Sequence, residues 1–398
     1  MKILIYLSLK IFFLSDRKLS NGQALTVRGK LVPSSGSQQT IELLCDSIDI
    51  IGDCASKDYE IGHINFVHFD YLRERIHMRS RLHYFQAMNR VRSQAMLAIQ
   101  MFMTQNDFIQ VNTPMITSND CEGTGECFTV HSNNHKEYFG REAFLTVSGQ
   151  LHLETMAAAL SKVWTLGPVF RAEKSMSPKH LSEFLMLEVE ESFLDKLNPL
   201  LDRTETLVKF IAMFLEQRCE HDLKYLREEN KFKSFNIQDR FKRITYNNAI
   251  EILQHTPDCE NEPIYLNSKM EQKLVEVMGN VPTFVTHYPL DQKPFYMKSD
   301  EKFNSFSFDL LFPKVGEVAG GSLREGSFEK LQQNIQTKSL NYEANLKKLQ
   351  WYLDLRKFGH APTGGFGLGF DRLIQAFTGT ANIKDVVPFP RWPYHCYL

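Results

Sequence analysis

The chain has 398 residues, and its hydrophobic fraction of 43% with 23% charged residues is ordinary for a soluble globular protein. Its formal net charge of -1 excludes a global electrostatic attraction to nucleic acid, so any contact with RNA must come from a local basic patch. The seven cysteines include no CxxC pair, which argues against a structural zinc site and favours free thiols in a reducing compartment.

Residues 1–70 are predicted to form a small β unit. The apolar run 1–14 is too short and too interrupted to cross a bilayer, and we interpret it as a buried strand or as part of an organelle-targeting segment. Two runs with alternating apolar side chains, 25–32 and 41–50, flank the turn-rich sequence PSSGS at residues 33–37. We therefore expect a β-hairpin followed by a polar linker.

Residues 71–398 are predicted to form one larger domain of the α+β class. Apolar side chains recur at spacings of three and four on one face of a long helix: Phe85, Met88, Val91, Ala95, Ile99 and Phe102. The strand-like runs 163–170 and 184–189 lie close together in sequence, which favours an antiparallel sheet flanked by helices. The more charged stretch 218–281 is interpreted as an insertion at the edge of this domain.

A first polar constellation lies on two of these predicted strands. Arg171 and Glu173 point to the same face of a strand because side chains alternate with period two, and a hairpin that returns through Phe184 brings an aromatic ring beside them. A guanidinium matches phosphate oxygens, a carboxylate can accept from an exocyclic amine, and the ring offers a stacking plane. The set predicts an adenine-nucleotide site, and a surface salt bridge beside a core phenylalanine is the alternative.

A second constellation is the glycine-rich sequence GGFGLGFDRL at residues 364–373. Its glycines let the backbone approach a ligand closely, and the following helix presents Arg372 near its N-terminus. The sequence contains neither the GxGxxG dinucleotide fingerprint after a strand nor the GxxxxGK[ST] phosphate loop. An ATP site here would be of neither common type, and a glycine-rich strand packed on a helix is the alternative.

A third constellation pairs Asp309 with Glu317, ahead of the sequence GGSLRE at 320–325. Two carboxylates on neighbouring strand positions suit an oxygen-loving ion such as Mg²⁺ that also binds phosphates. Solvated carboxylates in a turn are the alternative interpretation.

The order of these three constellations resembles that of the class II aminoacyl-tRNA synthetases, and most closely that of the asparaginyl-tRNA synthetases. Residues 113–114, 169–193 and 364–373 resemble the first, second and third motifs of that family, and the similarity extends from about Gly22 to the C-terminus. It is also carried by residues 120–126, 146–151, 352–356 and 382–391. The resemblance implies a class II sheet flanked by helices, asparagine, ATP, Mg²⁺ and tRNA(Asn) as ligands, a homodimer built through the first motif, and no membrane partner.

Carried over residue by residue, the resemblance implies a role for each nucleotide-site residue. Arg171 and Arg372 would be catalytic, with Arg171 on the α-phosphate, and Arg372 and His180 on the outer phosphate. Glu173 would recognise adenine and Phe184 would stack on it. Gly369 would also contribute to the ATP site, and Asp309 and Glu317 would hold Mg²⁺, with Glu317 touching ATP as well.

The amino-acid pocket follows in the same way. The resemblance implies that Glu122 takes the α-amino group and that Ser148 and Gln150 line the pocket. A carboxylate at Glu154 could accept from the substrate amide and would repel aspartate, whereas Arg324 could donate to the side-chain oxygen of either substrate. The alternative is that Glu154 only caps or salt-bridges its own helix.

The N-terminal module departs from the family pattern, and the compartment and the function each have alternatives. The family begins with a five-stranded OB-fold, whereas residues 1–70 have room only for its last strands, so we expect a truncated OB-like anticodon-binding module. The closing residues 392–398 look most like mitochondrial members, which predicts the mitochondrial matrix, with the cytoplasm as the alternative. Aspartate–tRNA ligase, a non-catalytic RNA-binding paralogue and an ATP-dependent amide-forming enzyme are the competing functions.

Overall fold

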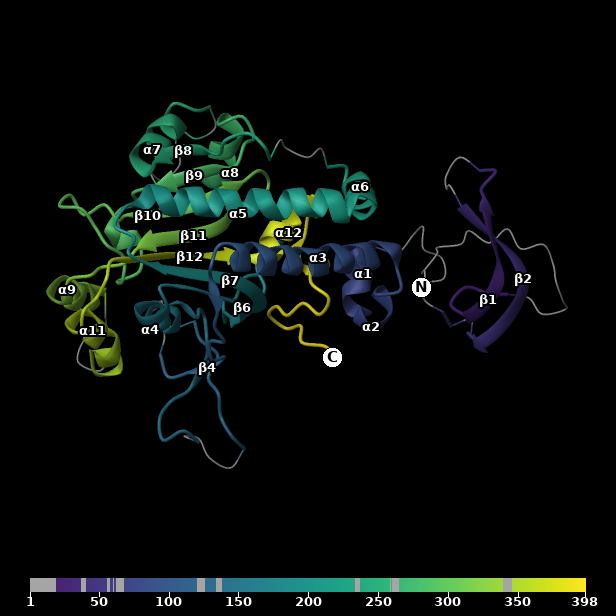
Figure 1. The fold of residues 1–398 in the computed structure, drawn as a ribbon, viewed down its shortest axis with the longest axis horizontal. Coiled ribbons are helices and arrows are strands. Elements are labelled where there is room, and N and C mark those ends of the chain that lie inside the picture. Colours follow the sequence, from purple (N-terminus) through teal and green to yellow (C-terminus); the bar gives the residue numbers. More distant parts are fainter. Residues whose placement is uncertain are drawn as a thin grey trace. The chain divides into compact units, whose positions relative to one another are not determined.

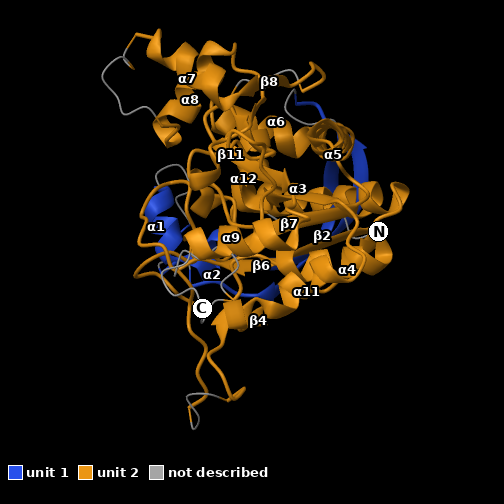
Figure 2. Cartoon of the chain, turned by 90° about the vertical axis from the view of Figure 1, so that its left-hand side faces the viewer, with its two compact units in different colours: residues 1–79 blue, residues 80–398 orange. Residues whose placement is uncertain are grey.

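The computed structural model describes residues 19–36, 41–55, 58–59, 61, 68–119, 126–133, 138–232, 237–257, 259, 265–338 and 346–398. The chain divides into two compact units, residues 1–79 and residues 80–398 (Figure 2). This division lies a little further along the chain than the predicted boundary at residue 70.

The first unit contains the predicted hairpin. Strands β1 (Ala24–Pro33) and β2 (Ile41–Gly52) pair antiparallel, and the short helices α1 (Phe69–Glu74) and α2 (Ile76–Arg79) follow. The register shifts between Arg28 and Gly29, where a Cβ on the glycine would collide with the carbonyl oxygen of Leu44. Only glycine fits this close approach of the two strands.

The second unit is built on an eight-stranded sheet (Figure 1). Its inner pairs, from β6 through β9, are antiparallel as predicted, whereas the two outermost pairs, β3 with β6 and β8 with β9, are parallel. In sheet order the strands are β3 (Ile109–Gln110), β6 (Lys162–Phe170), β7 (Glu183–Ser192), β12 (Thr363–Gly369), β11 (Gly316–Leu323), β10 (Ser307–Phe312), β9 (Thr283–Thr286) and β8 (Lys242–Thr245). A separate pair joins β4 (Ile116–Thr117) to β5 (Phe144–Leu145).

Helices flank this sheet. The predicted long helix is α3 (His83–Gln105), which packs side by side with α5 (Leu197–Arg218) and against α6 (Glu220–Glu229) (Figure 1). Helix α4 (Gln150–Leu160) packs on β6 and β7, and α12 (Phe370–Thr378) packs on β7. Helix α11 (Gln350–Lys357) contacts both α4 and α9 (Phe328–Lys338) around a core that includes Leu151, Tyr352 and Leu353.

The stretch 218–281, predicted as an insertion, extends the edge of the sheet. It supplies edge strand β8 and helices α6, α7 (Tyr246–Gln254) and α8 (Ser268–Val277). The side chains of Thr245 and Asn267 accept hydrogen bonds from backbone N–H groups at the starts of α7 and α8, as N-cap residues do. Among the described helices, none is both long enough and apolar enough to cross a bilayer.

Candidate active site

The side chains singled out in the first two constellations line one hollow on the sheet. Strands β7, β11 and β12, the start of α12 and the loop between β6 and β7 contribute to it. Arg171 and Glu173 lie in this loop and not on a strand as predicted, because β6 ends at Phe170. Its lining includes Arg171, Glu173, His180, Phe184, Met186, Glu317, Gly367, Gly369 and Arg372. Segments that are far apart in the sequence therefore converge as predicted.

The Arg171 guanidinium lies over the Phe184 ring, 5.7 Å from its centroid. Its Nη1 is 3.9 Å from Oε1 of Glu173, whose Oε2 is in turn 3.8 Å from Nε2 of His180. Burial and the nearby Arg372 lower the pKa of His180, so the imidazole is neutral at neutral pH. The result is a partly exposed row of an aromatic ring, two charged groups and a neutral imidazole.

Arg372 enters this row from the first turn of α12. Its Nη1 donates to the backbone oxygen of Glu317 at 2.9 Å and lies 3.8 Å from the Glu317 carboxylate. The neighbouring Asp371 is buried, and its carboxylate pairs with Arg92 of α3 and accepts from the backbone N–H of Leu185 at 3.0 Å. The start of α12 is thereby tied both to α3 and to β7.

The two predicted metal ligands face a common point. A Cβ placed on Gly320 would lie 3.2 Å from Oδ1 of Asp309 and 3.2 Å from Oε1 of Glu317. Both oxygens of Asp309 currently accept from Lys293 Nζ, at 2.8 and 2.7 Å. The donor set of carboxylate oxygens fits Mg²⁺, but a cation at Asp309 would have to displace the Lys293 ammonium.

A third carboxylate approaches this pair from α8. Burial, with Glu317 and Asp309 nearby, raises the pKa of Glu271 to about 7. No group of three or more His, Cys, Asp or Glu side chains within the described ranges is arranged to hold a metal ion. Glu271 is therefore a neighbour of the candidate site and not a further ligand in this arrangement.

The carboxylate of Glu188, on β7, binds the residues that directly precede α4. Ser148 Oγ donates to Glu188, and the backbone N–H of Gly149 donates to both oxygens of the same carboxylate, at 3.1 and 2.8 Å. Glu188 thus lies at the N-terminus of a helix, where the helix dipole favours a negative charge. It is on the same face of β7 as Phe184 and Met186 because side chains of a strand alternate.

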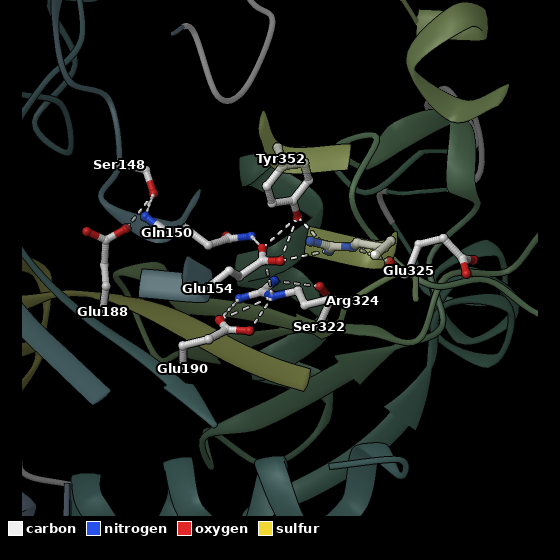
Figure 3. A network of polar contacts seen from close by, with 10 residues as sticks. Ser148, Gln150, Glu154, Glu188, Glu190, Ser322, Arg324, Glu325 and Tyr352 are labelled. Atoms are coloured by element: carbon white, nitrogen blue, oxygen red, sulfur yellow. Dashed lines mark hydrogen bonds and ion pairs between the residues drawn. The ribbon is translucent and has the colours of Figure 1, made fainter. Parts of the chain in front are cut away.

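Glu154 lies in a buried network of polar side chains (Figure 3). Both of its oxygens accept from the Tyr352 hydroxyl at 2.7 Å, Oε2 accepts from Arg356 Nη2 at 2.8 Å, and Oε1 accepts from Gln150 Nε2 at 3.2 Å. Burial alone would raise the pKa of Glu154, but the guanidiniums of Arg356 and Arg324 outweigh it and the pKa is lowered. The carboxylate is therefore ionised at neutral pH.

Arg324 is held on one edge by a second carboxylate. Its Nε and Nη2 donate to Glu190, the latter at 2.7 Å, and its Nη1 donates to Ser322 Oγ at 2.8 Å. Burial raises the pKa of Glu190 to about 7, so its carboxylate is mostly ionised at pH 8 and pairs there with the guanidinium of Arg324. A Cβ at Gly365 would collide with Glu190 and lie 2.8 Å from Arg324 Nη2, so only glycine on β12 leaves room for the pair.

Comparison with known proteins identifies the family of this chain. The sequence matches the family described as tRNA synthetases class II (D, K and N) over residues 70–393. An asparaginyl-tRNA synthetase of Homo sapiens is 40% identical over 405 residues, which cover 97% of this chain and 83% of that protein. An asparagine–tRNA ligase of Microcystis aeruginosa is 42% identical over 394 residues, 95% of this chain and 85% of that one. The chain belongs to the asparagine–tRNA ligases of class II.

A solved structure supports the same family. The asparaginyl-tRNA synthetase of Pyrococcus horikoshii, complexed with asparaginyl-adenylate, superposes with a TM-score of 0.83 at 28% sequence identity, covering 94% of this chain and 84% of that one. A probable mitochondrial asparagine–tRNA ligase of Dictyostelium discoideum is 40% identical over 406 residues, 96% of this chain and 85% of that one. The relatives of this chain thus include a probable mitochondrial asparagine–tRNA ligase.

The site of this ligase contains functional candidates that the sequence did not single out. Glu188 and Glu190 continue the period-two row that begins at Phe184, a signal that could have found them. Tyr352 and Arg356 stood out only through family resemblance. Lys293 had no local signal, because its partner Asp309 is fixed by the pairing of distant segments.

Two predicted residues of the amino-acid pocket, Glu122 and Glu154, are not seen in the roles expected for them. Glu122 lies outside the described residues. Glu154 was expected to accept directly from the substrate amide, whereas three protein donors, from Tyr352, Arg356 and Gln150, already share its two buried oxygens. An indirect role for Glu154 fits this geometry better, and it also fits better than a simple helix cap.

Proposed function

We propose that this ligase activates asparagine with ATP to asparaginyl-adenylate, releases pyrophosphate, and transfers the asparaginyl group to the 3′ end of tRNA(Asn). The observation that carries the proposal is the continuous row on one face of β7, where Phe184 and Met186 in the nucleotide hollow are followed by Glu188 and Glu190 beside Arg324. A nucleotide and a small polar amino acid bound along this row would meet end to end.

The nucleotide half is proposed to act by position and charge. Adenylation requires the substrate carboxylate and the α-phosphate to be held in line while cations neutralise the charge that develops on phosphorus-bound oxygens. Arg171 would contact the α-phosphate, and Arg372 with His180 would contact the outer phosphates. Phe184 would stack on adenine, with Glu173 at its exocyclic amine. Gly369 would let the backbone approach ATP.

Glu317 and Asp309 are proposed to hold Mg²⁺ with ATP. The ion would neutralise phosphate charge when bound. The chain's own part is to present both carboxylates to one point beside Gly320. Asp309 would also have to leave the Lys293 ammonium, which donates to it in this structure. Glu317, whose side chain is 43% exposed, is the more accessible of the two ligands.

The amino-acid half is proposed to use Ser148, Gln150, Glu154 and Arg324 around the substrate side chain, with Glu122 at the α-amino group. Arg324 keeps N–H groups beyond those used by Glu190 and Ser322, so it can donate to the side-chain oxygen. The Glu188 carboxylate already accepts from Ser148 and from the backbone N–H of Gly149, so its part would be to fix the start of α4 beside the pocket.

We also propose a homodimer and a mitochondrial location. Exposed apolar side chains at Ile109, Met115 and Ile116 follow α3, close to the segment that resembles the first family motif. Symmetric dimers are the commonest assembly, and such a surface would favour one. A single monomeric species at micromolar concentration in sedimentation would contradict the dimer, and fluorescence microscopy of the tagged full chain would test the compartment.

Aminoacylation of tRNA(Asn) by purified protein, with asparagine and aspartate compared, tests the function directly. We expect ligation of asparagine and little use of aspartate. Preference for aspartate would favour an aspartate–tRNA ligase, failure to bind ATP with Mg²⁺ would favour a non-catalytic paralogue, and amide product without tRNA would favour the third alternative.

A further inference from the structure

The network around Glu154 joins elements from distant parts of the chain. Glu154 comes from α4, Glu190 from β7, and Tyr352 and Arg356 from α11, while Arg324 directly follows β11 (Figure 3). The ionised side chains are between 0% and 2% exposed, so the network lies in a poorly solvated environment. Charges in such surroundings interact far more strongly than charges at the surface.

Glu154 forms an ion pair with Arg324 but no hydrogen bond. Its Oε1 is 3.8 Å from Arg324 Nε, and the hydrogen bonds of Arg324 go to Glu190 and Ser322 instead. An arginine has five N–H groups, and these bonds leave one N–H on each Nη nitrogen. A buried carboxylate that lost its own donors would turn to the nearest cation, and Arg324 would then lose the N–H groups that a substrate oxygen needs.

Two of the three donors that hold Glu154 in place come from α11, and the third is Gln150 of α4 itself. Tyr352 bonds to both oxygens of Glu154, and Arg356 bonds both to Glu154 and, at 2.9 Å, to the Tyr352 hydroxyl. Arg356 Nε is itself fixed on the backbone oxygen of Glu325 at 3.0 Å. The three side chains form a closed triangle that fixes the orientation of Glu154.

At pH 8, where Glu190 is mostly ionised, these four side chains are also balanced in charge. Glu154 and Glu190 contribute two negative charges, and Arg324 and Arg356 contribute two positive ones. An asparagine side chain adds no charge to this set, whereas an aspartate side chain adds an uncompensated negative charge in a poorly solvated site. Because asparagine and aspartate are nearly isosteric, this charge difference is a stronger basis for selection than shape.

We propose that Tyr352 and Arg356 are positioning residues that hold Glu154 away from Arg324, and that the resulting neutral network selects asparagine over aspartate. The inference rests on the proposed amino-acid pocket around Arg324. It gives Glu154 a role in selection without direct contact with the substrate amide.

The test measures ATP–pyrophosphate exchange at pH 8 with asparagine and with aspartate, alongside thermal melting of each variant. Glu154→Gln leaves the network with one excess positive charge, so kcat/KM for aspartate relative to asparagine should rise by about tenfold or more. Arg356→Met should raise the KM for asparagine and leave the KM for ATP unchanged. Tyr352→Phe keeps the charge, so it should raise the KM for asparagine without changing the ratio between substrates.

A double variant and a matched control make the test specific. Glu154→Gln with Arg356→Met restores neutrality, so the aspartate-to-asparagine ratio should return to within about threefold of wild type even if the efficiency stays low. Lys357→Met removes the next cation on α11, which is 44% exposed and pairs with Asp354 at 3.4 Å, and should change neither substrate's kinetics.

The outcomes separate this inference from the proposed pocket. An unchanged substrate ratio in Glu154→Gln, or a double variant that accepts aspartate as readily as that single variant, would overturn the neutral-network inference. Asparagine-dependent exchange that survives in Arg324→Met would instead overturn the pocket assignment. If Arg324→Met abolishes exchange while the Glu154, Tyr352 and Arg356 variants behave as wild type, only the positioning inference fails.

Discussion

Arg92→Met is expected to damage the proposed nucleotide site, although Arg92 is not among the residues that line it. Arg92 lies on α3 and pairs with the buried carboxylate of Asp371, which also accepts from the backbone N–H of Leu185. Asp371 precedes Arg372, and Leu185 follows Phe184. The ion pair therefore connects α3 to the two side chains proposed to bind the outer phosphates and adenine.

The size of the effect follows from burial. The side chains of Arg92 and Asp371 are 7% and 2% exposed, and breaking such a pair leaves an uncompensated charge that costs about 3–5 kcal/mol. Arg92 also lies 5.0 Å from the centroid of the Phe370 ring, and that contact would be lost too. Part of this cost would appear as displacement of Arg372 and Phe184, so the KM for ATP should rise by roughly tenfold.

The same helix provides a matched control. Arg90 pairs with Asp222 at 2.6 Å, but the Arg90 side chain is 48% exposed, so Arg90→Met should cost at most about 1 kcal/mol. A double variant, Arg92→Met with Asp371→Asn, removes both charges and keeps an oxygen for the Leu185 N–H. It should recover much of the stability that Arg92→Met loses.

The assay is thermal unfolding together with ATP–pyrophosphate exchange, with the KM for ATP and the KM for asparagine measured separately. A rise in the KM for ATP with an unchanged KM for asparagine would support the coupling. Equal stability losses in the Arg90 and Arg92 variants, or a KM for ATP that stays at the wild-type value, would refute the reasoning.

Three further predictions concern the nucleotide site and its acidic neighbour. Arg171→Ala should lower asparagine-dependent exchange by about 10²–10³-fold, because it removes a preorganised cation from the α-phosphate, and a near wild-type rate would contradict this role. Phe184→Ala should raise the KM for ATP by roughly tenfold through lost stacking, and an unchanged KM would argue against adenine at this ring. Burial, with Glu317 and Asp309 nearby, raises the pKa of Glu271 from 4.5 to about 7. Between these two pKa values the folded state binds more protons than the unfolded state, so the stability of the fold falls as the pH rises through this range. In metal-free buffer Glu271→Gln should therefore be more stable than wild type by ~1–3 kcal/mol at pH 8, and the two proteins should be equally stable near pH 4.5. Equal stability at pH 8 would show that the pKa of Glu271 is not raised.

Local patterns in the sequence were sufficient for the fold class and for most of the side chains that line the proposed nucleotide site. The apolar spacing along α3 predicted a helix, and alternation predicted that Arg171 and Glu173 lie close together, which they do, although in the loop after β6 and not on a strand. Arg372 followed from a glycine-rich strand that leads into a helix. These features depend on neighbours a few residues apart, so their geometry is set by the backbone of a single element.

The parallel edge pairs of the sheet and the partners of the buried charges were decided by tertiary structure. Glu154 is separated by 198 residues from Tyr352 and by 202 from Arg356, and Arg92 by 279 from Asp371. No local pattern records such pairs, because each arises only when strands and helices from distant segments pack together and exclude water from the groups between them. The residue types by themselves indicated an adenine-nucleotide site, the resemblance of the motifs indicated an asparagine–tRNA ligase, and packing alone determined that Glu154 is surrounded by the chain's own donors.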